Sequence, residues 1–248
     1  MWLVSVAVIG VLLVADYHLS YGALVDVGAL RRLFNLARED GLASWLQSTQ
    51  TLLAGSTLWI VYGLVRSQSA SKWVQRGWLV LAAFFTYMAV DDGAQIHERL
   101  ASTLDAVAGE RAVSFFPSYT WQIVFLPVFI TLGLFVLAFL WRELPSVRER
   151  AWLVGALGCL GFAVGLDFLE GLDVGDSLNV YAHIARTDEG LRVWSFSRFG
   201  SSAYDSLRHF SRAVEESLEM LAIATFWSLF IGHLAKVAAD VRVFQRST

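Results

Sequence analysis

The sequence has little of what builds a soluble protein. It contains one cysteine, Cys159, and three prolines, and only 17% of its 248 residues are charged. The single cysteine excludes a disulfide framework and a thiolate metal site. The low charge is unusual for a soluble domain of this length. With a formal net charge of −3 and no basic run, the chain also gives no reason to expect a nucleic-acid partner.

Apolar residues make up 56% of the chain instead. They gather in runs of about 17 to 25 residues, which is the length of a membrane-crossing helix, and they do not alternate as in a strand. The sequence therefore predicts an all-α protein, a single integral membrane bundle over residues 1–248 in contact with the lipid bilayer. Its six transmembrane helices are expected near 2–19, 43–65, 78–99, 121–141, 151–172 and 212–234.

The segments between the expected spans differ in character. The first span lacks a basic leader and a small-residue cleavage site, so we expect it to be retained. Between the first two spans, Leu30, Leu33 and Phe34 follow helical spacing, which predicts a short helix in the membrane interface. The longest connection, 173–208, is rich in aromatic residues. It could cover a site, dock a partner or rest on the lipid headgroups.

Basic residues indicate the orientation. The connections at 66–76 and 142–150 and the tail after Leu234 each carry three Lys or Arg and a net positive charge. Short positively charged connections are typically cytoplasmic. The expected location is therefore the inner membrane of a bacterium, with both termini in the cytoplasm and 173–208 outside.

Acidic residues and histidines gather at the outer end of the expected bundle. Because the directions of the helices follow from the topology, four of the six spans place carboxylates or imidazoles at about the same level. They are Asp16 and His18 on the first span, Asp91, Asp92, His97 and Glu98 on the third, Asp167 and Glu170 on the fifth, and His209, Glu215, Glu216 and Glu219 on the sixth. The opposite ends carry mostly Arg and Lys.

Helical phase allows three of these helices to turn an acidic face inward. Each residue of a helix advances the direction by about 100°, so Asp91, Gln95 and Glu98 fall within an arc of about 60° on the third span. Asp92 and His97 point elsewhere if that helix is regular, although Gly93 permits a local distortion. The acids of the fifth and sixth spans likewise share a face.

Acids at this depth need compensation, because an ionised Asp costs at least about 2.5 kcal/mol on insertion scales. A metal site, a proton or ion relay, and solvated helix ends are the open interpretations. Mixed His and carboxylate ligands from facing helices are typical of metal sites in bundles, and zinc or iron suits them, although no ExxH pair of the di-iron type is present. The candidate metal ligands are Asp91, Asp92, His97, Asp167, Glu170, His209, Glu216 and Glu219, and the candidate catalytic groups are Glu98 and Glu215.

Two motifs resemble a family of uncharacterised bacterial polytopic membrane proteins. They are an acidic pair followed by His-Glu in VDDGAQIHERL, and Glu-Glu followed by Glu in VEESLEML. The segment LFNLAREDGLASWLQ resembles the same family, and Asp92 departs from it, since Glu is expected there. The chain also resembles, more weakly, the ceramidase-like membrane hydrolases, but it lacks their late pair of histidines. The first resemblance implies a shared site and no particular reaction.

Three functions remain open at this stage. The first is a metalloenzyme near the outer membrane face that acts on a membrane-associated substrate. The second is a non-catalytic accessory subunit of a larger membrane complex, with other membrane subunits as partners. The third is a proton or ion transporter, against which the chain has no internal repeat.

Overall fold

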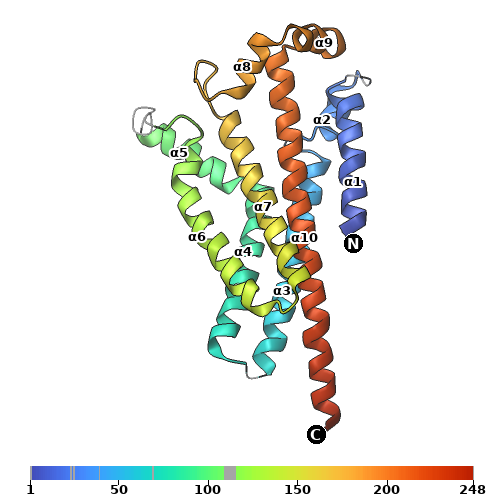
Figure 1. The fold of residues 1–248 in the computed structure, drawn as a ribbon, viewed down its shortest axis with the longest axis vertical. Coiled ribbons are helices and arrows are strands. Elements are labelled where there is room, and N and C mark those ends of the chain that lie inside the picture. Colours follow the sequence, from blue (N-terminus) through green and yellow to red (C-terminus); the bar gives the residue numbers. More distant parts are fainter. Residues whose placement is uncertain are drawn as a thin grey trace.

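The computed structural model describes residues 2–247 except 23, 25, 39, 69 and 109–115. In the described residues the fold is all-helical, as the sequence predicts (Figure 1). The long elements are α1 (Trp2–Ala15), which runs on into the π-helical turn η1 (Asp16–Ser20), α3 (Leu42–Ser67), α4 (Lys72–Ala94), α6 (Thr120–Glu143), α7 (Val147–Glu170) and α10 (Ala203–Ser247). The short helices are α2 (Gly28–Leu33), α5 (Ile96–Ala108), α8 (Val180–Thr187) and α9 (Glu189–Phe199).

Four helical segments within the described residues are long and apolar enough to cross a membrane. They are Trp2–Ser20, Trp121–Glu143, Val147–Glu170 and Ala203–Ala239. Apolar side chains on their outer surfaces, such as Leu134 at 62% and Phe162 at 60% exposure, suit lipid better than water. The chain is therefore a membrane protein, while the six-helix count is not confirmed. Helices α3 and α4 have 26 and 23 residues, but polar side chains interrupt their apolar runs.

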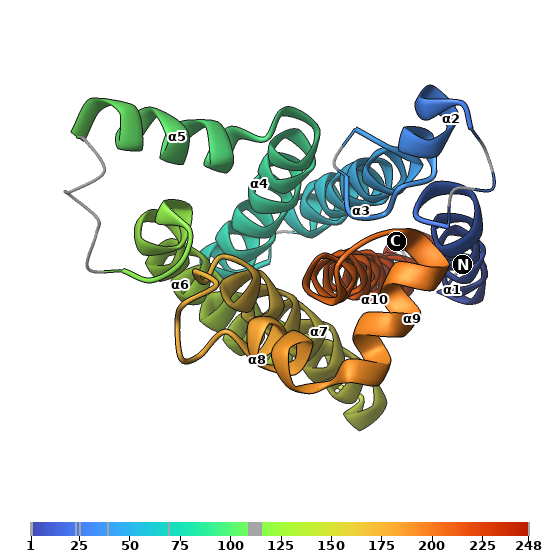
Figure 2. The same ribbon diagram turned by 90° about the horizontal axis from the view of Figure 1, so that it is seen from above.

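Helix α10 occupies the centre of the bundle. It packs against α7, α3 and α1, and α3 packs along α4 (Figure 2). The main core lies in the half of the bundle that contains the α3–α4 turn, where Trp78, Phe85, Phe226 and Phe230 are almost fully buried. The same cluster contains Leu58 of α3 and Phe139 of α6, so its burial holds the four long helices α3, α4, α6 and α10 together.

A close contact between α4 and α6 depends on a glycine. The rings of Trp78 on α4 and Phe139 on α6 lie 5.2 Å apart, edge to face. A Cβ atom at Gly77 would overlap the Phe139 ring, which is itself 2% exposed and has no room to move. Glycine at this position therefore lets the two helices approach.

Two expectations for individual segments need correction. The helix expected through 78–99 is broken, because Gln95 adopts a left-handed conformation (φ 52°, ψ 45°) between α4 and α5. The break falls at Gln95 and not at Gly93. The connection 173–208 is largely helical, since it contains α8 and α9 and the start of α10. The short helix expected between the first two spans is present as α2 and ends at Leu33.

Replacing Gly77 with Ala should lower the melting temperature of the purified protein by several degrees. The added methyl overpacks a closed contact, and overpacking typically costs about 1–3 kcal/mol. Gly63→Ala on α3 is the matched control, because a Cβ there meets no described atom within 4 Å. Thermal unfolding in detergent, followed by circular dichroism, measures both variants. Equal melting temperatures would contradict the close contact.

Candidate functional site

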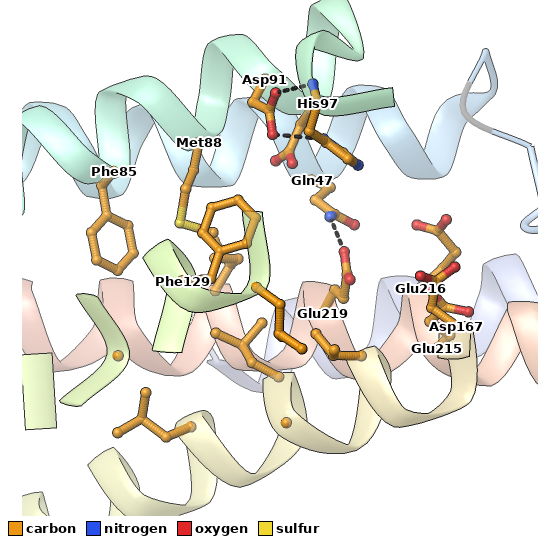
Figure 3. A pocket seen from close by; sticks show the side chains of 18 of the residues that line it. Gln47, Phe85, Met88, Asp91, His97, Phe129, Asp167, Glu215, Glu216 and Glu219 are labelled. Atoms are coloured by element: carbon orange, nitrogen blue, oxygen red, sulfur yellow. Dashed lines mark hydrogen bonds and ion pairs between the residues drawn. The ribbon is translucent and has the colours of Figure 1, made fainter. Parts of the chain in front are cut away.

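A cavity of about 530 Å³ lies inside the bundle, between α3, α4, α6, α7 and α10. Its two ends differ in chemistry (Figure 3). One end is lined by acidic and amide side chains, and the other by aromatic and aliphatic ones such as Phe85, Met88 and Phe129. A cavity of this volume lies in the range of pockets that bind one small molecule.

The break between α4 and α5 shapes one wall of the acidic end. Asp91, which is 6% exposed, accepts a hydrogen bond from the His97 backbone N–H through Oδ1 at 3.0 Å. Its Oδ2 lies 2.8 Å from Nδ1 of the His97 ring. The left-handed Gln95 makes this geometry possible by turning the chain back, so that His97 reaches Asp91 across the corner. The break thus brings into the cavity a histidine that a regular helix would direct away.

Helix α3 supplies amide and hydroxyl partners to the acids. Gln47 donates from Nε2 to Oε2 of Glu219 on α10 at 2.7 Å. The hydroxyl of Thr51 donates to Oδ2 of Asp92 on α4 at 3.3 Å. Gln47 is 7% exposed and lines the cavity, and its Oε1 finds no donor among the described residues. A buried amide oxygen in this condition is an available acceptor or cation ligand.

The third wall comes from α7 and α10. Gln122 at the start of α6 donates from Nε2 to Oδ2 of Asp167 at 2.8 Å. Glu215 and Glu216 line the cavity beside Asp167. Oε2 of Glu215 is buried and has no donor among the described residues.

Negative charge exceeds positive charge in the lining. Of the described residues, six carboxylates line the cavity, namely Asp91, Asp92, Asp167, Glu215, Glu216 and Glu219. Arg212 and His97 are the basic groups in the same lining. Because charges removed from water need compensation, this excess favours bound protons or a bound cation.

Two of the proposed ligands lie outside the cavity lining. Glu170 is paired with Arg208, at 3.2 Å, and with Arg212, at 3.6 Å. His209 is 2.7 Å from Oδ2 of Asp16 and stacks on Tyr21 with ring centroids 4.1 Å apart. Both side chains are thus engaged in contacts that tie helices together.

A tyrosine beside Glu170 remains a hydrogen-bond donor. Burial, together with the charge of Glu170, raises the pKa of Tyr119 to about 12. Its hydroxyl is therefore protonated at neutral pH and lies 3.5 Å from Oε1 of Glu170.

The structure brings together most of the predicted site residues. Six of the eight proposed ligands line the cavity, as does Glu215; they are Asp91, Asp92, His97, Asp167, Glu216 and Glu219. The side chain of Glu98 lies outside the described residues. Sequence reasoning missed Gln47, whose signal was its polar spacing with Gln50 and Thr51 along one face of α3. No group of three or more described His, Cys, Asp or Glu side chains is arranged so as to hold a metal ion.

The apolar helices and the internal cavity define a helical membrane protein with an acid-lined pocket in its bundle. The chain matches a domain of unknown function, DUF8692, over residues 3–234, and it belongs to that family. No curated protein and no solved structure matches it. The family match is consistent with the resemblance to an uncharacterised family, and none of the comparisons supports a link to ceramidase-like hydrolases.

Replacing Gln95 with Val should destabilise the corner between α4 and α5. A β-branched residue is poorly accommodated at positive φ, and such strain costs about 1–3 kcal/mol. Gln95→Gly is the matched control, since glycine adopts the same backbone conformation without strain. The melting temperature in detergent should fall clearly further for Gln95→Val. Equal melting temperatures of the two variants would contradict the claim that the left-handed backbone conformation limits which residue is tolerated at this position.

Proposed function

We propose that the protein is a membrane-embedded metalloenzyme whose acidic cavity end binds a divalent cation and whose apolar end admits a membrane-associated substrate. The single observation that supports this function is the division of one cavity into an acidic and an apolar end. A cation in the acidic end would offset the excess of carboxylates. It would also act as a Lewis acid or activate a water molecule.

The donor types favour a metal that accepts both nitrogen and oxygen ligands. Asp91 and His97 approach from the α4–α5 corner, and Glu219 and Glu216 from α10. Zinc and iron both take such mixed ligands. The side chains now pair with one another, so metal binding requires the Gln47–Glu219 and Asp91–His97 contacts to exchange for contacts with the ion.

Glu215 is the best candidate for moving a proton. Its Oε2 is buried, faces no described donor, and belongs to a side chain that lines the cavity. A carboxylate without a fixed partner beside a metal-bound water can accept its proton. Glu98 remains a second candidate for this role.

Metal analysis of the purified protein tests the proposal. Wild type should carry about one zinc or iron per chain, and Asp91→Asn and Glu219→Gln should lose most of it, because each removes an anionic ligand while keeping the side-chain volume. Inductively coupled plasma mass spectrometry gives the ratio directly.

Asp205→Asn provides the control for this measurement. Asp205 is an exposed acid on the same helix, α10, whose side chain bonds Ser202 at 2.7 Å. This variant should keep its metal. Wild type that carries no stoichiometric metal, even after growth and purification with added zinc and iron, would contradict the proposed function.

The proposed topology has six crossings, with α3 and α4 also spanning the membrane of a bacterial cell and both termini in the cytoplasm. Their 26 and 23 residues are long enough for this. Several of their polar residues are directed into the bundle, as the bonds of Gln47 to Glu219 and of Gln50 to Ser5 illustrate. Such inward placement is how spanning helices tolerate polar side chains.

Single cysteines in a Cys159→Ser background distinguish six crossings from four. In spheroplasts, an impermeant thiol reagent should label Ser177→Cys, in the connection before α8, and should leave Ser67→Cys, at the end of α3, unlabelled. Both positions are exposed. If α3 and α4 do not cross, both lie on the same side and both become labelled. Permeabilised cells are the control, because both cysteines should then react.

An accessory role in a larger complex is favoured by one surface feature. Helix α9 exposes Val193 at 64% and Phe196 at 73%, at the end of the bundle where α8 also lies. Size determination in a mild detergent separates the two functions, since an obligate accessory subunit would not purify as a lone, metal-loaded chain.

A further inference from the structure

The apolar end of the cavity resembles a site for a hydrocarbon chain. Four long helices contribute side chains without any polar group to its described lining. They are Phe84, Phe85, Phe129, Ile130, Leu157 and Ile223. A cavity lined in this way is poorly wetted, because water needs polar partners to occupy it.

Two glycines keep this end open. Gly133 on α6 and Gly161 on α7 both line the cavity. A Cβ atom at either position would meet no described atom within 4 Å. Glycine in a spanning helix commonly lets two helices approach, as Gly77 does here. Gly133 and Gly161 do not serve that purpose, since open space lies where a side chain would stand.

Helices α4 and α6 have few contacts with each other within the described residues. Helices α4 and α6 touch through Trp78 and Phe139 near one end of the bundle. Further along, residues of both helices line the cavity, and within the described residues α6 has its main contacts with α5 and α7. A lipid-soluble molecule between α4 and α6 would therefore reach the cavity without crossing water.

The acidic end restricts which polar head a molecule could have if its hydrocarbon chain lay in the apolar end. Six described carboxylates stand against Arg212 and His97 in the lining. A phosphate or carboxylate head would add to the excess of negative charge, whereas an ammonium head would reduce it. The uncompensated Oε1 of Gln47 is a further acceptor for an N–H donor.

We propose that the cavity binds a single-chain amphiphile with an amine head, the chain lying past Gly133 and Gly161 and the amine lying among the carboxylates. The volume of about 530 Å³ suits one such molecule. This inference names the substrate class of the proposed enzyme and rests on the same cavity. Binding of the chain does not itself require the metal.

Photolabelling with matched probes tests the inference. The probes are a long-chain alkylamine and the alkyl phosphate of the same chain, each with a diazirine at the far end of the chain. The full-length protein in nanodiscs should be labelled by the amine on α6 and α7, in peptides that contain Gly133 and Gly161. The phosphate should label these peptides about tenfold less, since its charge adds to that of the acids.

Filling the cavity supplies the structural control. Gly161→Leu and Gly133→Leu place a side chain in the open space and should reduce labelling by the amine about tenfold, as expected when a few methylene groups lose their pocket. Gly155→Leu on the same helix α7 is the matched variant. A Cβ there also meets no described atom within 4 Å, and Gly155 does not line the cavity. Its labelling should equal that of wild type.

The outcomes separate this inference from the proposed metal site. Labelling that is equal for amine and phosphate, or equal in Gly161→Leu and Gly155→Leu, overturns the inference. The protein could also carry no stoichiometric metal and still be labelled specifically by the amine in EDTA. That result supports the inference and contradicts the proposed metalloenzyme function. If the leucine variants do not fold, competition in wild type decides, because unlabelled alkylamine must then suppress labelling of α6 and α7 and alkyl phosphate must not.

Discussion

Compensation of buried carboxylates is the constraint on which the arrangement of this bundle depends. An acid within a membrane-spanning bundle needs a partner, and each partner here comes from another helix. Gln47 of α3 bonds Glu219 of α10, Gln122 of α6 bonds Asp167 of α7, and Arg208 of α10 pairs with Glu170 of α7. The polar contacts therefore join specific pairs of helices, while the core around Trp78 buries large apolar side chains of α3, α4, α6, α7 and α10.

The all-helical fold could be predicted, because apolar runs of helical length are a property of local sequence. The sequence also indicated that acids of the third, fifth and sixth expected spans would converge, and Asp91, Asp167 and Glu216 do line one cavity. The conformation of Gln95 could not be predicted, since a positive φ at a residue other than glycine is imposed by surrounding contacts. That one dihedral angle decides that His97 faces the cavity.

Long-range pairing was the other limit of sequence reasoning. His209 and Glu170 lie at the expected depth, but whether an acid or imidazole faces a cavity or a neighbouring helix depends on partners far along the chain. His209 pairs with Asp16, and Glu170 pairs with Arg208. Nor does any sequence pattern distinguish Gly77, which permits close packing, from Gly161, which leaves space.

The contact between Asp16 and His209 joins two residues that are 193 positions apart, near opposite ends of the chain. Membrane proteins are made and inserted from the amino terminus, so α1 enters the bilayer long before α10 has been synthesised. During that interval Asp16 lacks the imidazole partner that it has in the folded chain. Helix α10 thus closes the bundle, and a chain interrupted before α10 would leave both α1 and the acidic cavity unassembled.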